Sequence, residues 1–262
     1  MNGVPVRRPA VAGIFYPDDP DQLRGDVERY IAAGGHVAGS LRGVIVPHAG
    51  YRYSGSVAGE AYARVAVAER DWRRVVIAGP THFVPLHGIA VPSVDAFATP
   101  LGDVALDRGA LDALTSHRHI VIDDHAHLRE HSLEVQLPFL LETVGPVPVV
   151  PLGVGAAAPD VVADVLDELW DDDTLVVIST DLSHYLPYEL ARERDQRTSA
   201  AIAAFDTDAI APHDACGAYV LRGFLDLARR REMSVREVAL RSSGDAGGSR
   251  DSVVGYGAFV VA

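Results

Sequence analysis

The sequence contains a single cysteine, two methionines and two tryptophans among its 262 residues. One cysteine cannot form a disulfide bond within the chain, which fits a reduced, cytoplasmic setting. Acidic residues outnumber basic ones by 36 to 23, so the chain lacks the positive charge typical of proteins that bind nucleic acids or anionic membranes. No apolar run is long enough to span a bilayer, and residues 1–8 lack the hydrophobic core of a secretory signal. We therefore expect a cytoplasmic protein that binds neither nucleic acid nor membrane.

Several common catalytic and nucleotide-binding motifs are also missing. The sequence has no Gly-x-x-x-x-Gly-Lys loop and no Gly-x-Gly-x-x-Gly turn, so it shows no sign of a nucleotide site. It has no Gly-x-Ser-x-Gly elbow of a serine hydrolase and no His-Glu-x-x-His motif of a zinc protease. The chemistry must therefore be sought in residues that the fold brings together from distant segments.

Three short apolar runs each end at a histidine. Val44–Pro47 precedes His48, Val75–Pro80 precedes Thr81 and His82, and residues 175–180 are followed by the segment Asp181–His184. Continuous β-branched runs of this length are typical of strands buried on both faces of a parallel sheet. Ligands of open α/β sheets bind beyond the carboxyl ends of the strands. The pattern predicts that the three imidazoles meet in one crevice.

Predicted strands alternate with predicted helices along the whole chain. This alternation predicts one α/β domain over residues 1–262, with a mostly parallel central sheet flanked by helices. Residues 88–94 and 97–106 read as two extended segments that could form a hairpin. Helices are predicted over residues 131–143 and 216–230, the latter capped by Asp214.

His48, His82 and Cys216 are the candidate metal ligands. A proline near the end of each of the first two strands fixes the chain and would hold the following imidazole firmly. A helix start at Cys216 would lower the pKa of its thiol and favour the thiolate, which is the form that binds metal. Two imidazoles and a thiolate suit Fe(II), Cu or Zn and leave positions open for water or substrate. The alternative is that each histidine only caps a strand, and that Cys216 is a small buried hydrophobic residue.

His184 is the candidate general base, and Asp181 could orient an imidazole or hold a water. His184 could instead be a metal ligand itself. His131 and Glu134 lie three residues apart and would share a helix face, where they could bind substrate or only support the helix start. Tyr51 and Tyr53 are candidate walls of the crevice, with core packing as the alternative.

The sequence resembles the Memo family, known in prokaryotes as protein B of the AmmeMemoRadiSam system. The resemblance covers nearly the whole chain. It lies in Ala12-Gly13-x-Phe15-Tyr16, Pro47-His48-Ala49-Gly50-Tyr51-x-Tyr53-Ser54-Gly55, Gly79-Pro80-x-His82, Glu130-His131-Ser132-x-Glu134-x-Gln136-Leu137-Pro138-Phe139 and Ser179-x-Asp181-Leu182-Ser183-His184-Tyr185.

The family is similar in fold to the class III extradiol dioxygenases, which implies a mixed central sheet flanked by helices. In those dioxygenases two histidines and a glutamate bind Fe(II), and a further histidine is the acid/base. By resemblance His48 and His82 match the two ligands, His184 matches the acid/base, and Cys216 stands in place of the glutamate. Memo proteins carry this cysteine and bind iron or copper. A thiolate is softer and more oxidisable than a carboxylate, which argues against catechol ring cleavage.

Three functions are consistent with these residues. The first is a mononuclear metal-dependent redox enzyme or oxygenase that acts on a small substrate. The second is a non-catalytic binding or scaffold protein that retains the dioxygenase-like crevice; the resemblance implies a peptide ligand, or an AMMECR-like protein and a radical SAM enzyme as partners. The third is a metal-free hydrolase with Cys216 as nucleophile and His184 as base, which leaves His48 and His82 without a role.

Overall fold

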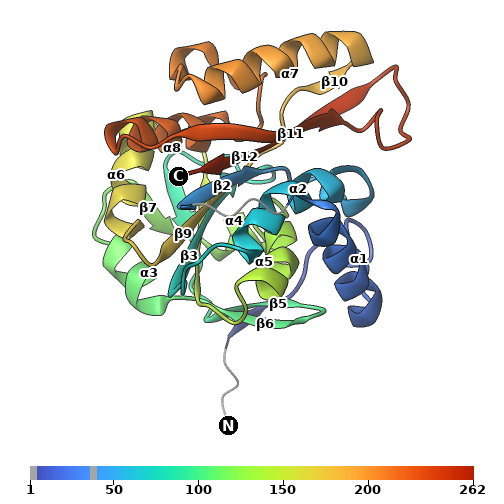
Figure 1. Ribbon diagram of the computed structural model, residues 1–262. Helices are drawn as coiled ribbons and strands as arrows, with labels where there is room; N and C mark the ends of the chain where they lie inside the picture. Colours follow the sequence, from blue (N-terminus) through green and yellow to red (C-terminus); the bar gives the residue numbers. More distant parts are fainter. Residues whose placement is uncertain (1–4, 36–39) are drawn as a thin grey trace.

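Four parallel strands form the centre of a mixed sheet (Figure 1), in the order β2 (Gly43–Val46), β9 (Thr174–Ser179), β3 (Arg74–Pro80) and β8 (Val149–Val154). They are rich in β-branched residues, and nearly all of their side chains are buried. This burial on both faces matches the continuous apolar runs in the sequence. Because the strands are parallel, their carboxyl ends meet at one edge of the sheet, directly before the histidine-bearing loops.

The flanks of this sheet are largely antiparallel. Beside β2 lies β12, which also pairs with β10 and β11, and beyond β8 lies β4, which runs antiparallel to β8 and parallel to β7. The mixed sheet is thus confirmed, with parallel strands at its centre and a further parallel pair, β4 and β7, at one edge. The outer strands are β4 (Ile89–Val91), β7 (Ile120–Ile122), β10 (His184–Leu186), β11 (Val235–Ser242) and β12 (Val253–Val261).

A separate small sheet contains part of the predicted hairpin. It has the order β1 (Val6–Arg7), β5 (Ala96–Thr99) and β6 (Gly102–Ala105), with β5 and β6 antiparallel and β1 parallel to β5. The expected partner of β5, the segment 88–94, joins the large sheet through β4 instead. The hairpin turn is therefore between β5 and β6, where Gly102 has a φ of 131° that favours glycine.

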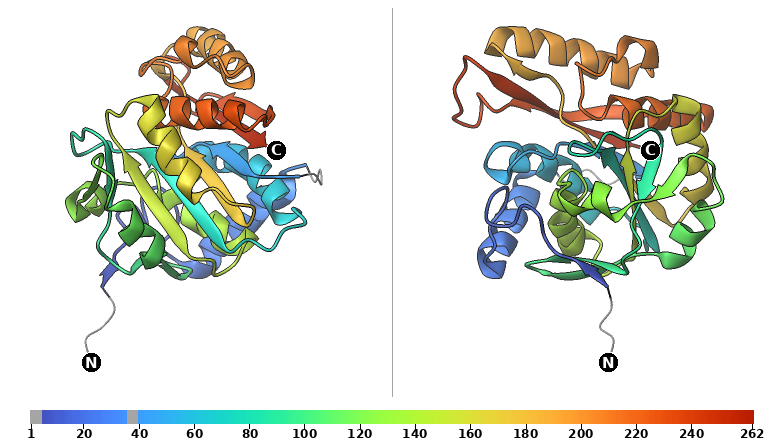
Figure 2. Two further views of the ribbon diagram at one scale, coloured as in Figure 1. Left: turned by 90° about the vertical axis from the view of Figure 1, so that its left-hand side faces the viewer. Right: turned by 180° about the vertical axis from the view of Figure 1, so that it is seen from behind.

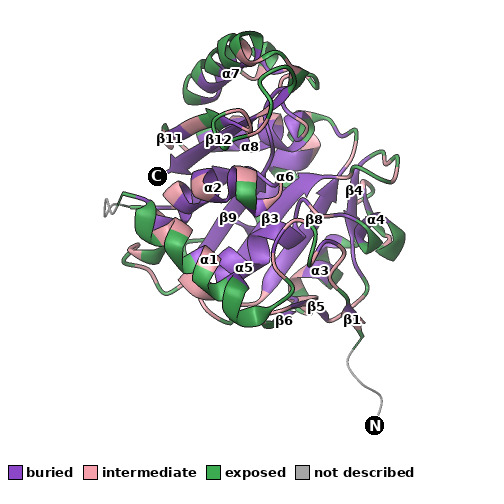
Figure 3. Ribbon diagram, turned by 90° about the vertical axis from the view of Figure 1, so that its right-hand side faces the viewer, coloured by how far each residue is buried: buried purple, intermediate pink, exposed green. Residues whose placement is uncertain are grey.

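Helices cover both faces of the large sheet. One layer is α1 (Pro20–Ala33), α2 (Tyr51–Ala66) and α5 (Leu137–Thr143), which pack on one another and lie in front of the buried strands in Figure 3. The other layer contains α6 (Pro159–Leu169) and α8 (Ala218–Arg230), which are paired on the opposite face (Figure 2). An outlying helix, α7 (Tyr188–Ala203), packs on β11 and β12. Two short helices, α3 (Arg108–Leu114) and α4 (Asp124–Leu128), lie near the far edge strands.

Two predicted helix starts are wrong. The helix expected from residue 131 is preceded by a 3-10 turn, Glu134–Gln136, and becomes α-helical only at Leu137. The helix expected from residue 216 begins at Ala218, after Gly217, and Asp214 caps no helix because its Oδ2 accepts the N–H of Ala211. Both errors leave the site residues His131 and Cys216 in loops.

The structure describes residues 5–35 and 40–262, and these form a single α/β domain. Within these ranges the helices are all too short or too polar to cross a lipid bilayer.

Candidate metal centre

His48 follows β2 and is almost completely buried at the edge of the sheet. Hydrogen bonds hold both its backbone and its ring. Its backbone N–H donates to Asp181 Oδ1 at 2.7 Å, and its Nδ1 lies 3.0 Å from Ser179 Oγ. The Ser179 hydroxyl already donates its proton to the carbonyl of Ser132, so Nδ1 of His48 must be the donor. The Nε2 lone pair of His48 is therefore free to accept a proton or bind a metal.

His82, after β3, is fixed by the carboxylate of Glu130. Glu130 Oε1 lies 2.9 Å from His82 Nδ1, and Oε2 accepts the backbone N–H of His82 at 2.6 Å. An ionised carboxylate can only accept, so Nδ1 of His82 carries the proton and Nε2 is free. Burial alone would raise the pKa of Glu130, but its hydrogen bonds and charge interaction with His82 hold that pKa well below the usual range.

His131 completes a cluster of three imidazoles. Its ring stacks on that of His82 with centroids 4.7 Å apart, and one nitrogen from each of His48, His82 and His131 lies within 4.8 Å of the others. The Nδ1 of His131 is buried and has no hydrogen-bond partner. Burial lowers the pKa of His131 to about 4 and the pKa of His48 well below 6.5, so both rings are neutral near pH 7. Neutral imidazoles with free nitrogens are ready to bind a cation.

Cys216 touches this cluster through His48. Its Sγ lies 3.3 Å from His48 Nε2 and accepts the backbone N–H of Asp181 at 3.3 Å. Burial, reinforced by the nearby Asp181, raises the pKa of Cys216 to about 12. The expected lowering by a helix start is wrong, because the helix begins two residues later and burial dominates. The side chain is then a thiol, which can donate to the His48 Nε2 at 3.3 Å or to the Asp181 carbonyl at 3.6 Å.

Asp181 positions the backbone of the site rather than an imidazole ring. Its buried carboxylate accepts the N–H of His48, and its own carbonyl accepts the N–H of Cys216 at 3.2 Å. Burial raises the pKa of Asp181 to about 7 against the lowering effect of the His48 and Ala49 N–H groups. Asp181 thus links the two loops that carry His48 and Cys216.

His184 opens the short strand β10 and is half-buried. Its Nδ1 lies 2.8 Å from the carbonyl of Leu182, which can only accept, so Nε2 of His184 is free. Burial lowers the pKa of His184 below 6.5, which favours the neutral, basic form. The structure is compatible with the predicted general base, and that role stays a prediction.

Tyr51 and Glu134 make their hydrogen bonds to groups other than the clustered imidazoles. Tyr51 is buried, packs against Phe139 and donates its hydroxyl to the carbonyl of Val135. Glu134 is fully buried and bonds Arg7 at 2.6 Å and the Tyr16 hydroxyl at 2.6 Å, so it holds the N-terminal segment. The substrate-binding roles of these residues stay predictions.

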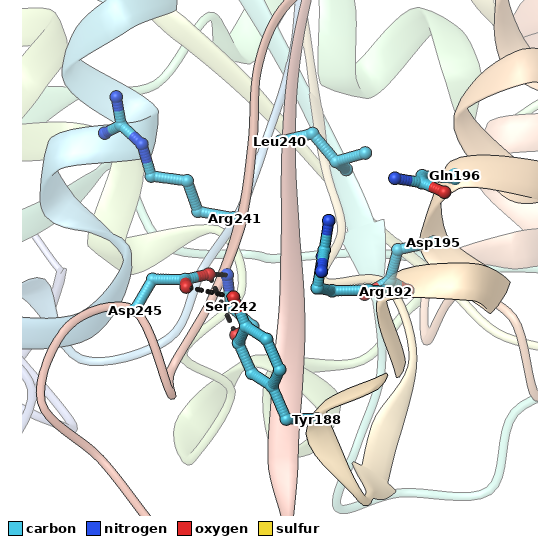
Figure 4. A pocket seen from close by; sticks show the side chains of 8 residues that line it. All are labelled: Tyr188, Arg192, Asp195, Gln196, Leu240, Arg241, Ser242 and Asp245. Carbon is cyan, nitrogen blue, oxygen red and sulfur yellow. Dashed lines mark hydrogen bonds between the residues drawn. The ribbon is translucent and has the colours of Figure 1, made fainter. Parts of the chain in front are cut away.

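The predicted wall residue Tyr53 lines a hollow beside the loop after β11. Next to it is a polar cavity of about 520 Å³ between α7 and β11 (Figure 4). In this cavity Asp245 accepts hydrogen bonds from the Tyr188 hydroxyl and from Ser242. None of the clustered histidines lines either hollow.

Comparison with known proteins identifies the family of this chain. The family model described as Memo-like protein matches residues 7–260. The chain belongs to the Memo family. A MEMO1 family protein of Methanopyrus kandleri is 35% identical, covering 97% of this chain and 98% of its own length. A MEMO1 family protein of Aquifex aeolicus is 37% identical, covering 78% of this chain and 76% of its own length.

The fold of this Memo family member is also seen in a solved structure. The crystal structure of the uncharacterized protein JW3007 from Escherichia coli K12 superposes with a TM-score of 0.52 and 13% identity. The match covers 84% of this chain and 99% of the other. At that identity the likeness establishes the fold alone.

Sequence reasoning missed two residues that hold the imidazoles of this Memo family member. Glu130 immediately precedes His131, but helical spacing pairs His131 with Glu134 instead and gives Glu130 no role. Ser179 ends β9 and belongs to an apolar run in the sequence. Its hydroxyl nevertheless lies 3.0 Å from His48 Nδ1, across the β2–β9 pair. A carboxylate beside a histidine was the only signal that the sequence offered.

Proposed function

We propose that this chain is a mononuclear metal-binding protein, with His48 and His82 as two nitrogen ligands, and that it carries out redox chemistry on a small substrate. The observation that supports this most is the cluster of three imidazoles, in which one nitrogen of each ring lies within 4.8 Å of the others. The His82 side chain is 27% exposed, so solvent and small molecules can reach the cluster.

The donor set suits a first-row transition ion. Imidazole nitrogens with a sulfur in reach favour Fe(II), Cu or Zn over Mg²⁺ or Ca²⁺, which prefer oxygen ligands. Iron or copper would supply the electron-transfer step when bound. Around it, Glu130 and Ser179 fix the rings, and His184 Nε2 can take a proton from a substrate hydroxyl at neutral pH.

The third protein ligand is either His131 or Cys216, and the two alternatives predict different absorption spectra for the metal-loaded protein. His131 offers a neutral nitrogen at once. Cys216 must first lose its proton, as thiols do when they bind metal, but its Sγ lies 3.3 Å from His48 Nε2, which supports a role as ligand. In the cobalt(II) derivative a thiolate ligand gives an intense near-ultraviolet charge-transfer band. The band should vanish in Cys216→Ser if the sulfur is the ligand, and no band should form in the wild type if His131 is.

Metal content after anaerobic purification tests the proposal. The wild type should contain about one Fe or Cu per chain, and His48→Ala and His82→Ala should each contain less than about a tenth of that, since two remaining donors bind weakly. His125→Ala, at an exposed histidine outside the cluster, is the matched control and should keep its metal. Full occupancy in both cluster variants would refute the ligand assignment. A wild type that contains no metal and takes none up would favour the scaffold function.

A further inference from the structure

Glu130 is a buried carboxylate surrounded by four hydrogen-bond donors. Its side chain is 1% exposed. Oε1 accepts from His82 Nδ1 at 2.9 Å, from the His131 N–H at 2.9 Å and from the Ser132 N–H at 2.8 Å. Oε2 accepts from the His82 N–H at 2.6 Å. One side chain therefore grips both the ring and the backbone of His82 and the start of the His131 loop.

This arrangement decides which nitrogen of His82 faces the cluster. A neutral imidazole carries one proton, and a carboxylate on Nδ1 draws that proton to Nδ1. Nε2 is left with its lone pair, the hydrogen bond at Nδ1 orients the ring, and the second hydrogen bond fixes the backbone of His82. Carboxylates in this position also raise the basicity of the opposite nitrogen.

We propose that Glu130 is a positioning residue, which fixes the tautomer and orientation of His82 and holds His131 beside it for metal binding. This inference rests on the proposed metal-binding function. The group of residues that could hold an ion in the described part of the chain consists of His48, His82 and His131, so Glu130 is not one of the proposed ligands. Its effect reaches the metal through the two imidazoles.

Replacement by glutamine shows why the charge matters. Glutamine has the same shape, but one of its two oxygens becomes an NH₂ group. If its oxygen takes the place of Oε1, the NH₂ faces the His82 N–H, and two donors oppose each other. If it takes the place of Oε2, the NH₂ faces three donors. Neither orientation satisfies the site, so the His82 loop must shift.

The test compares Glu130→Gln with Glu134→Gln by titration of the metal-free proteins with cobalt(II). Both residues are buried carboxylates in the same segment, but Glu134 faces the N-terminal segment. We expect cobalt(II) affinity to fall about 10- to 100-fold in Glu130→Gln, the usual cost of losing such a partner. In Glu134→Gln the affinity should stay within about threefold, although stability falls. Equal affinities for Glu130→Gln and the wild type would overturn the proposal.

A second readout needs no metal. Nitrogen-15 NMR of the metal-free wild type, assigned with a His82→Gln sample, should show the His82 ring protonated at Nδ1 only. Glu130→Gln should show a mixture of tautomers or exchange between them. A wild-type ring protonated at Nε2 would also overturn the proposal, even if Glu130→Gln does not fold. If the ring is protonated at Nδ1 but the wild type binds no cobalt(II), the proposed function fails while the positioning by Glu130 stands.

Discussion

At the scale of single residues, the imidazoles share one arrangement of protons. Nδ1 of His48, His82 and His184 each faces an acceptor, namely a hydroxyl oxygen, a carboxylate and a backbone carbonyl. In all three the free nitrogen is Nε2, which is the one farther from the backbone, and in His48 and His82 it is the one better able to reach a shared ion. The histidines could be picked out from the sequence but this pattern could not, because the acceptors of His48 and His82 come from distant segments of the chain.

His127 provides a prediction on pH, away from the metal ligands. Burial lowers the pKa of His127 to about 4, against the raising effect of its 3.1 Å contact with the Ala90 carbonyl. The unfolded chain takes up a proton near pH 6.5, but the folded chain resists it until about pH 4. The folded state is therefore favoured at pH 7 and loses stability as the pH falls between these values. At pH 5 the free energy of unfolding should be lower than at pH 7 by about 2 kcal/mol because of His127 alone.

Urea unfolding at pH 7 and pH 5 measures this effect. In His127→Gln the amide can still donate to Ala90 but cannot titrate, so the difference in unfolding free energy between the two pH values should shrink by about 2 kcal/mol. His125→Gln makes the same exchange at an exposed position and should keep the wild-type difference. An unchanged pH difference in His127→Gln would show that His127 is not responsible.

At the scale of elements, the strands could be predicted better than the helix starts. Continuous runs such as Val44–Val46 are decisive, since a strand buried on both faces admits little else. Helix starts depend on local competition. Ser54 is a good capping residue by type, yet it lies inside α2 and donates to the Ala49 carbonyl, while Gly50 occupies the cap. The spacing of apolar residues likewise does not predict the 3-10 turn before Leu137.

Two helices end in the same way, which allows a matched prediction. After α8, Glu232 has a φ of 56°, and after α7, Phe205 has a φ of 57°. In each case the next N–H, of Met233 or of Asp206, bonds the helix carbonyl five residues back, as in a Schellman motif. Glycine suits this left-handed position, where the backbone strain of other residues costs about 1 kcal/mol. Glu232 is exposed, whereas Phe205 packs on the core.

Glu232→Gly should therefore raise the free energy of unfolding by about 0.5–1 kcal/mol, because it removes strain and loses no packing. Phe205→Gly removes the same strain but also a half-buried ring, so it should lower that free energy by about 2 kcal/mol. Chemical denaturation of the two variants decides between these signs. A loss of stability in Glu232→Gly would mean that its side chain has a role beyond the turn.

At the scale of the whole molecule, the convergence of His48 and His82 was predictable because both follow parallel strands of one sheet. The third imidazole was not, since His131 comes from a loop rather than a strand end. That loop is held from a distant part of the chain. Arg7, in β1, donates to the carbonyls of His127 and Glu130 and to the carboxylate of Glu134. A local sequence pattern cannot reveal contacts between residues that are more than a hundred positions apart in the chain.

Arg7→Met tests how far the fold depends on this contact. The Arg7 side chain is 5% exposed and Glu134 is fully buried, so the substitution leaves a buried carboxylate without its cation. We expect a loss of about 3 kcal/mol in the free energy of unfolding, the usual cost of breaking a buried ion pair from one side. Hydrogen exchange should also become faster in residues 5–16 and 127–134, which Arg7 joins. Arg8→Met removes the same charge from an exposed neighbour and should change stability by less than about 0.5 kcal/mol. If the two variants lose equal stability, the effect belongs to net charge, and the N-terminal segment does not brace the loop that carries Glu130 and His131.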